Sequence, residues 1–496
     1  MVEIDKKIIK AYALKNAVEH GGKAVSGSVI SGLFNHGLSK EGIKDIMPAL
    51  NAILKEINVL STSEQEKEYK EFEGLIGHRV EREGLPELEN VDLKKGVIMR
   101  FSPSSSASAF HIGHILTGMP TSLYVKKYGG KLYLRIEDTN PEKTVPECYD
   151  SFPKEAEWIF GNISEWYAQS DRMKKYYDFA EDLIKKGLAF VCTCKKQEDD
   201  SETFKKREPC DCRNNNIKDN QSKWKKMLDF KGYSEGEAVL RFKSPDLNLN
   251  NPALIDFPLA RINLTSHPRQ GKKYRVWPLM NLCVTYDDME QKCTHIIRAK
   301  EHRDNAKRQE QIFDALSVPK PISYFLGRYK FLDLPISKTQ ITELIKKGKF
   351  DGWDDIRLPL ARNFKRRGYL PEAFEKMAIQ RGISEVDKVI SQKDFFEVLN
   401  NFNRELLRDT TRKADFEKCS EKEANLVILM PDAKKVFGKT NFKSKNPQKS
   451  KISGNSKSKT FEVEETVYFS KFGYAKHNGS FGEGKNAKPF FWFCHE

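Results

Sequence analysis

The first part of the chain places apolar side chains at the spacing of amphipathic helices. One set lies on a single helical face: Ile8, Ile9, Tyr12, Ala13 and Ala17. Further along, Ser63-Glu64-Gln65-Glu66 has the pattern of a capping box and predicts the start of another helix. A polar stretch with a proline follows at residues 81–90. We therefore expect residues 1–90 to form a helical domain that ends in a linker.

A different pattern begins near residue 94. Residues 96–101 are apolar enough for a buried strand, a serine-rich loop follows, and residues 111–128 have the pattern of a helix. Two glycines end this helix, and residues 131–136 predict the next strand. Strand, helix and strand in this order make a βαβ unit, so we expect a parallel sheet.

The later part of the chain mixes both patterns. Helical stretches surround a cysteine-rich loop in residues 142–235, and an apolar strand candidate lies at residues 294–297. Residues 340–415 are mostly helical in pattern.

The last 80 or so residues have a weaker pattern. A strand candidate lies at residues 426–430, and residues 461–496 alternate like a small β segment. Between them, residues 439–459 contain seven lysines and no acidic residue. We expect that this tract cannot fold by itself, because it has too little apolar surface to bury.

The chain carries 85 basic and 70 acidic residues, a formal net charge of +15. An excess of this size favours polyanions such as nucleic acid, although it can also serve solubility alone. There is no run of about 18 apolar residues, and the charged N-terminus lacks the apolar core of a signal peptide. We expect a cytoplasmic protein with no membrane partner.

His111-Ile112-Gly113-His114 lies where the serine-rich loop meets the predicted helix. Free backbone N–H groups and the positive end of the helix dipole favour an anion at this place. Imidazoles three residues apart share a helix face and can donate to phosphate oxygens, and Gly113 gives a ligand room near the backbone. The alternative is a pair of surface histidines, which the position after a strand of a βαβ unit disfavours.

Four of the nine cysteines form a CxC–x15–CxC pattern: Cys192, Cys194, Cys210 and Cys212. An odd cysteine count with irregular spacing argues against a disulfide framework. Paired thiolates on either side of a charged loop suit a tetrahedral Zn²⁺ with four sulfur ligands. Four protein ligands leave no open position, so we expect a structural zinc; the alternative is two adventitious cysteine pairs.

The sequence His-Ile-Gly-His after such a strand resembles the HIGH motif of class I aminoacyl-tRNA synthetases. The neighbouring residues 100–104 and 134–139 resemble glutamyl- and glutaminyl-tRNA synthetases. Three further segments are similar to the archaeal-type glutamyl-tRNA synthetases: residues 274–279, 294–302 and 352–359. The resemblance covers residues 1–415.

This resemblance implies an α/β fold with a Rossmann-type catalytic domain at residues 91–330. Its zinc-containing insertion, about residues 142–235, would bind the tRNA acceptor stem. Residues 1–90 would be the N-terminal helical extension, and residues 331–415 a KMSKS-like loop with a helical stem-contact region. Residues 416–496 would be a shortened, β-barrel-like anticodon-binding region that includes the lysine- and serine-rich tract.

The second family motif, KMSKS, corresponds to Pro335-Ile336-Ser337-Lys338-Thr339. The family implies a set of residues that bind ATP with its Mg²⁺: His111, Gly113, His114, Ser337 and Lys338. Both histidines and the lysine are the implied catalytic residues. Pro335 replaces the first lysine of the motif, and Gln340 replaces a lysine that often follows it. These departures concern the rate rather than the reaction.

Glutamate has an α-ammonium and two carboxylates, so a complementary site needs one acid and two cationic anchors. The family pattern assigns these to Glu137, Arg100 and Arg298, with three polar residues beside them: Ser102, Ser104 and Asn281. Arg298 favours glutamate over glutamine, because a buried guanidinium facing an amide would lack a counter-charge. The alternative is a structural salt bridge from Arg298 to Glu301 or Asp287.

The resemblance thus implies an ATP-dependent glutamate–tRNA ligase that forms glutamyl-adenylate and charges tRNA-Glu, and we expect a monomer. A shortened anticodon-binding region would discriminate poorly between tRNAs. Three other functions stay open from the sequence: a glutaminyl-tRNA synthetase, a non-discriminating glutamyl-tRNA synthetase, and an inactive RNA-binding paralogue.

Overall fold

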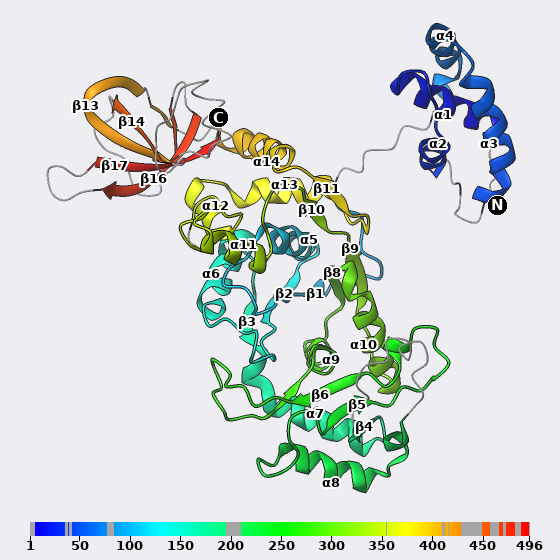
Figure 1. Ribbon diagram of the computed structural model, residues 1–496, viewed down its shortest axis with the longest axis vertical. Coiled ribbons are helices and arrows are strands. Elements are labelled where there is room, and N and C mark those ends of the chain that lie inside the picture. Colours follow the sequence, from blue (N-terminus) through cyan, green and yellow to red (C-terminus); the bar gives the residue numbers. More distant parts are fainter. Residues whose placement is uncertain are drawn as a thin grey trace. The chain divides into compact units, whose positions relative to one another are not determined.

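The computed structural model describes residues 5–34, 38, 42–76, 84–194, 210–353 and 355–408, and from residue 412 onward the backbone of six strands. The chain divides into two compact units, Met1–Glu83 and Gly84–Glu496 (Figure 1). None of the helices described is long and apolar enough to cross a membrane.

The first unit is helical. Its elements are α1 (Lys6–Glu19), α2 (Ser26–Leu33), α3 (Ile43–Ile57), α4 (Thr62–Phe72) and a short 3₁₀ turn, η2 (Glu73–Leu75). Leu14, Leu33 and Leu50 are fully buried in its core. The capping box predicted at Ser63 is wrong by two residues. Ser61 is the N-cap of α4: its backbone N–H donates to the Glu64 carboxylate at 2.8 Å, and its hydroxyl accepts from the Glu64 N–H.

A parallel sheet forms the centre of the second unit (Figure 1). Strands β1 (Val97–Phe101), β2 (Gly130–Ile136) and β3 (Glu165–Ala168) pair in this order, all parallel. Helix α5 (Ile112–Tyr128) connects β1 to β2, as the sequence predicts. A second parallel pair, β8 (His295–Ala299) with β9 (Ile322–Leu326), meets β1 through Thr294, whose backbone N–H donates to the Ile98 carbonyl at 2.8 Å.

Helices cover this sheet and bury its apolar residues. Helix α5 packs on β1, α6 (Cys148–Phe160) follows β2, and the first 3₁₀ turn after β3 is η3 (Gln169–Arg172). Close packing requires a glycine at position 118, because a Cβ there would lie 2.5 Å from the Phe160 ring and 3.0 Å from the Phe101 ring. This packing holds α5 against the sheet, with the histidine motif at the start of the helix.

A region of mixed structure follows β3. It contains α7 (Met173–Lys185), β4 (Ala189–Cys192), η5 (Asp211–Asn214), α8 (Ile217–Leu228), β5 (Val239–Phe242), η6 (Pro252–Leu254), β6 (Pro258–Ile262) and β7 (Val276–Pro278). The four strands form an antiparallel sheet in sequence order. Helix α9 (Met280–Glu290) leads back to β8, and η7 (Lys300–His302) and α10 (Arg303–Ala315) follow that strand.

The region after β9 is mostly helical, as expected. It contains α11 (Lys338–Lys346), α12 (Ala361–Arg367), α13 (Pro371–Arg381) and α14 (Gln392–Leu407), with a small parallel pair, β10 (Tyr329–Phe331) and β11 (Lys388–Ile390).

The last strands form one sheet of six. They are β12 (Arg412–Ala414), β13 (Phe416–Val427), β14 (Lys449–Ser456), β15 (Thr466–Phe469), β16 (Gly473–Phe481) and β17 (Lys488–His495). Strand β14 lies in the lysine-rich tract and pairs antiparallel with β13, so this part of the tract forms structure with a neighbour rather than alone. The end of the strand predicted at 426–430 lies outside the described residues.

Candidate active site

The histidine motif forms the start of helix α5. His111 is the N-cap residue, and its Nδ1 accepts a hydrogen bond from the Gly113 backbone N–H at 3.0 Å. The His114 Nδ1 accepts in turn from the His111 backbone N–H at 3.3 Å. The two rings stack with their centroids 3.9 Å apart. The motif is therefore a capping box built from imidazoles, and it fixes both rings to the backbone.

These contacts determine where the ring protons lie. A nitrogen that accepts a hydrogen bond carries no proton, so each neutral ring must carry its proton on Nε2. Burial lowers the pKa of His111 to about 4. Burial, followed by the nearby charge of a protonated His111, lowers the pKa of His114 well below its ordinary value. Near neutral pH both rings are uncharged Nε2–H donors.

The side chain of His111 also requires a glycine at position 113. A Cβ at this position would lie 2.8 Å from the Cε1 atom of His111. The small residue thus makes room for the imidazole as well as for any ligand that approaches the backbone.

The residues just before the helix are held from two sides. The Glu155 carboxylate on α6 accepts the Phe110 backbone N–H at 2.5 Å. The Phe110 carbonyl accepts from the Ala361 N–H at 2.8 Å, and the Ile112 N–H donates to the Pro359 carbonyl at 2.9 Å. The start of α12 and the buried carboxylate thus fix the backbone around His111.

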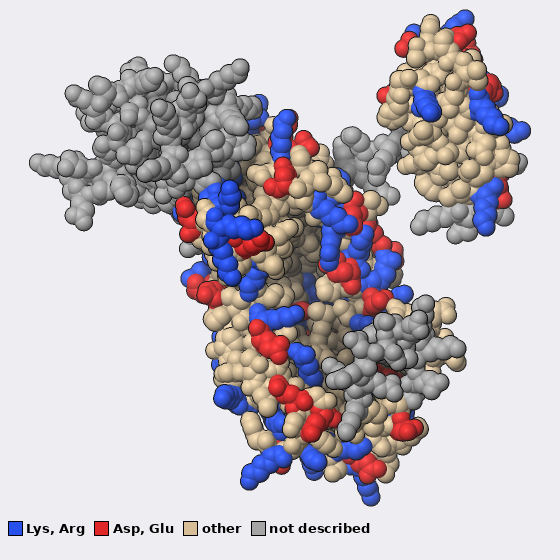
Figure 2. Space-filling view, viewed as in Figure 1, with Lys and Arg blue, Asp and Glu red and all other residues tan. Residues whose placement is uncertain are grey.

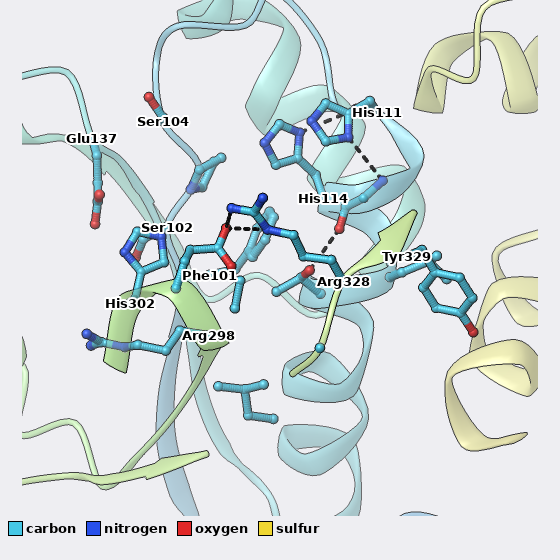
Figure 3. A pocket seen from close by; sticks show the side chains of 18 of the residues that line it. Phe101, Ser102, Ser104, His111, His114, Glu137, Arg298, His302, Arg328 and Tyr329 are labelled. Carbon is cyan, nitrogen blue, oxygen red and sulfur yellow. Dashed lines mark hydrogen bonds and ion pairs between the residues drawn. The ribbon is translucent and has the colours of Figure 1, made fainter. Parts of the chain in front are cut away.

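A cavity of about 460 Å³ opens beside the histidines. Its lining includes eight of the predicted ligand-binding residues besides Gly113: Arg100, Ser102, Ser104, His111, His114, Glu137, Arg298 and Ser337. Figure 3 shows the two imidazoles on one side of the cavity and Glu137, Arg298 and His302 on the other. The predicted ATP-binding and glutamate-binding residues thus share one cavity, at the carboxyl ends of β1, β2 and β8.

Two predicted residues do not line this cavity. Met280 rather than Asn281 reaches it, and Asn281 lies behind, with its Oδ1 3.4 Å from the Gln309 Nε2. Lys338 is exposed at the start of α11, where Ser337 is the N-cap residue. Lys338 borders a second cavity of about 310 Å³ with Trp353 and Arg362. His111 and Ile336 border both cavities, so the two are adjacent.

Arg100 belongs to a buried ionic network. Its Nε lies 3.3 Å from Asp288, which also accepts from Arg135 at 2.7 Å. Burial opposes ionisation of Asp288, but the charges of Arg100, Arg135 and Arg298 lower its pKa to about 2. Asp288 therefore stays ionised near neutral pH and is the counter-ion of Arg100 and Arg135.

Glu137 lies at the end of β2, close to this network. Arg135 approaches its carboxylate at 3.6 Å. Burial raises the pKa of Glu137, and the positive charges of Arg135 and Arg100 oppose that rise. A bound ammonium group would favour the ionised form further.

Arg298 has no such counter-ion among the residues the structure describes. Neither of the alternative salt bridges of Arg298 forms: Glu301 pairs with Arg328, and Asp287 pairs with Arg172 at 3.0 Å. The residue is only 7% exposed, and its Nε has no hydrogen-bond partner. Burial and the charge of Arg100 lower its pKa to about 9, so it stays largely protonated at neutral pH. A buried cation that faces a cavity is suited to a carboxylate ligand.

The four motif cysteines come together between β4 and η5. All four sulfur atoms lie within 4.8 Å of one another, with Cys192 to Cys210 at 3.6 Å and Cys194 to Cys212 at 3.7 Å. Tetrahedral zinc with Zn–S bonds of about 2.3 Å places its sulfurs about 3.8 Å apart. The cluster is compatible with such an ion.

The sequence assigned no role to several polar residues of the cavity lining, among them His302, Gln309, Arg328 and Arg381. Glu301-His302 was part of a recognised segment, but nothing in its spacing assigned it a role. The others come from α10, the β9–β10 turn and α13, and only the folded chain brings them together.

On the face drawn in Figure 2, basic and acidic side chains are interspersed around a hollow in the larger unit. Some charged side chains of this unit pair with one another: Lys300 and Lys330 both contact Asp387, at 2.8 and 2.9 Å.

Comparison with known proteins identifies the family. The family model for the catalytic domain of class I tRNA synthetases (E and Q) matches residues 96–408. The glutamate–tRNA ligase of Methanobrevibacter smithii is 37% identical over 404 residues, covering 80% of this chain and 71% of that protein. The glutamate–tRNA ligase of Pyrococcus furiosus is 38% identical over 455 residues, covering 87% of this chain and 77% of that protein.

Among solved structures, a glutamate tRNA ligase from Elizabethkingia meningosepticum is 21% identical, with a TM-score of 0.46, covering 63% of this chain and 70% of that one. The assignment therefore rests on the family model and the sequence relatives. The chain belongs to the class I tRNA synthetases of the glutamate and glutamine group.

Proposed function

We propose that this protein is a glutamate–tRNA ligase, which activates glutamate with ATP and transfers it to tRNA-Glu. The observation that carries this proposal is Arg298, a buried guanidinium that lines the cavity without an ion pair to any described carboxylate. The side-chain carboxylate of glutamate would be its counter-ion. The amide of glutamine would leave the buried charge uncompensated.

The rest of the pocket accommodates the remaining groups of glutamate. Glu137 would bind the α-ammonium, and Arg100, held by Asp288, would attract the α-carboxylate. Ser102 supports this arrangement, because its buried hydroxyl has no partner within the described structure and is free to bind a ligand. Ser104 would add a polar contact at the rim.

Activation joins the glutamate α-carboxylate to the α-phosphorus of ATP and releases pyrophosphate. His111 and His114 would donate their Nε2–H groups to the phosphate oxygens at the start of α5. Ser337 and Lys338 would approach from the start of α11, where an ammonium group near the departing pyrophosphate would lower the barrier by ~3–4 kcal/mol. ATP would arrive with Mg²⁺, which neutralises phosphate charge.

Transfer then moves the glutamyl group from the adenylate to a hydroxyl at the 3′ end of tRNA and releases AMP. The insertion would bind the acceptor stem, the region from residue 331 to 415 the neighbouring stem, and the final sheet the anticodon. The enzyme would work as a monomer in the cytoplasm, where charged tRNA is used.

The cysteine cluster would hold a structural zinc in the insertion. Four thiolates would complete its coordination, so it would stabilise the fold without touching the reaction. We expect about one zinc per chain by metal analysis. Cys194→Ser should lower both the zinc content and the melting temperature, whereas Cys148→Ser should leave the zinc content unchanged.

An ATP–pyrophosphate exchange assay tests the function. Glutamate with tRNA-Glu should support exchange, glutamine should not, and the same mixture should yield glutamyl-tRNA. Omitting tRNA is informative only alongside this complete reaction. Exchange with glutamine at a similar rate would contradict the proposal, and charging of tRNA-Gln with glutamate would identify a non-discriminating enzyme.

A further inference from the structure

Gln309 is the residue that contacts the guanidinium of Arg298. It lies on α10, is 4% exposed and lines the cavity. The Arg298 Nη1 donates to its Oε1 at 3.0 Å, and its Nε2 donates to the Asn281 Oδ1 at 3.4 Å. No other side chain of the described residues hydrogen bonds to the Arg298 guanidinium. The three residues form a chain that leads away from the cavity.

The sense of this chain is fixed by chemistry. A guanidinium has donors and no acceptor, so Gln309 must present its carbonyl oxygen to Arg298. Its amide nitrogen must then face Asn281, which must present its own oxygen. One orientation of both amides therefore satisfies both contacts. In this orientation Gln309 holds the Arg298 guanidinium, and Asn281 holds Gln309.

The neutrality of Gln309 matters as much as its position. The acidic groups near Arg298 are Asp288 and Glu137, and both already contact Arg135. A neutral amide can hold a guanidinium without cancelling its charge, whereas a carboxylate at the same place would form a buried ion pair.

We propose that Gln309 is a positioning residue for substrate choice: it holds Arg298 by a neutral acceptor, so that the substrate's side-chain carboxylate becomes the counter-ion. The proposal rests on the proposed function, because it takes glutamate as the substrate. Asn281 orients Gln309 and does not contact glutamate itself.

Gln309→Glu is the direct test, since it keeps the size and the acceptor but adds a counter-ion. With ATP–pyrophosphate exchange in the presence of tRNA-Glu, we expect the KM for glutamate to rise about 30-fold or more, in the range for an altered buried charge contact. The KM for ATP should stay unchanged. The preference for glutamate over glutamine in kcat/KM should fall by about the same factor.

Gln309→Leu separates charge from structure. It removes the acceptor while leaving Arg298 charged, so the KM for glutamate should rise about 10-fold, but the preference for glutamate should persist. A merely structural role predicts equal losses of preference in both variants, which would overturn the proposal. Asp314→Asn is the matched control on the same helix, because it also exchanges a carboxylate and an amide; Asp314 is exposed, pairs with Lys320 outside the cavity lining, and the kinetics of the variant should match the wild type.

Two further outcomes are distinguishable. If wild-type protein fails to activate glutamate, the proposed function fails, whereas a Gln309→Glu variant with wild-type preference overturns the role of Gln309 alone. If Gln309→Glu does not fold, Asn281→Asp takes its place. It puts a carboxylate one hydrogen bond further from Arg298, so the same loss of preference should appear at a smaller size, and an unchanged preference would overturn the proposal.

Discussion

The two sides of the cavity are built in different ways. On the histidine side, the rings bond to backbone N–H groups within three residues of themselves, and burial keeps them uncharged. On the arginine side, the groups are charged and come from strands and helices far apart in sequence; Arg100 and Asp288 are 188 residues apart. The histidine side thus offers fixed neutral donors. The arginine side offers charged groups, of which Arg298 has no counter-ion among the described residues.

This difference suggests a division of work. Neutral donors at a helix start suit phosphates, whose charge is shared with Mg²⁺ and varies during the reaction. A buried cation without a counter-ion suits an amino acid that must be told apart from its amide. The histidine side should therefore control the rate, and the arginine side the choice of substrate.

The largest expected effect is on the arginine side. Arg298→Gln should lower kcat/KM for glutamate about 1000-fold, because the substrate carboxylate would lose its buried partner. Activity with glutamine should change much less. Pyrophosphate exchange with glutamate and with glutamine measures the two kcat/KM values. Arg303→Gln is the control, since this exposed arginine pairs with Glu385 at the surface, where ion pairs contribute little. Equal losses for glutamate and glutamine would break the comparison.

On the histidine side, His111→Asn should lower kcat about 100-fold, as for the loss of one donor to developing charge. Asparagine is a good N-cap residue, so helix α5 and the melting temperature should be preserved. The KM for glutamate should change little. A variant whose kcat is normal but whose KM for glutamate is raised would assign the histidine to substrate choice instead.

The uncharged state of the histidines predicts a pH effect on stability. The folded pKa of His111 is about 4, below the roughly 6.5 of an exposed histidine. Between these two pH values the unfolded chain binds more protons at this residue than the folded chain does. The free energy of unfolding therefore falls as the pH is lowered through this range. From pH 7 to pH 5 the loss should be about 2 kcal/mol in the free energy of unfolding.

Urea unfolding of the wild type and of His111→Asn at both pH values measures this contribution as a difference. The comparison with the variant is needed because Glu155 acts in the opposite direction. Burial raises the pKa of Glu155 to about 7, so the contribution of Glu155 to the free energy of unfolding declines as the pH rises. Equal pH dependence in the two proteins would show that His111 is not held in the neutral form.

The smallest kinetic effect concerns the backbone before the motif. Glu155→Leu should lower kcat about 10-fold, because the Phe110 N–H would lose its acceptor and the histidine would be held less firmly. Glu155→Gln keeps a carbonyl acceptor and should stay within about 3-fold of the wild type. Similar losses in both variants would mean that the charge of Glu155, rather than its hydrogen bond, supports the site.

The sequence predicts the histidine side better than the arginine side for the same physical reason. The strand at 96–101, the helix from 111 and the strand at 131–136 follow from local periodicity, and the ring contacts span three residues. The sequence does not place the capping box of α4 correctly, because Ser61 with Glu64 and Ser63 with Glu66 both fit the local pattern. Gln309 could not be found at all, since its role depends on β8, α9 and α10 meeting in space.

A crystal structure of the full chain with glutamate bound would test the central claim most directly. The account predicts the glutamate side-chain carboxylate within about 3 Å of the Arg298 guanidinium, with Gln309 still accepting from Nη1 and no protein carboxylate paired to Arg298. Glutamate bound with its side-chain carboxylate on another residue, or Arg298 paired with a protein carboxylate, would contradict it.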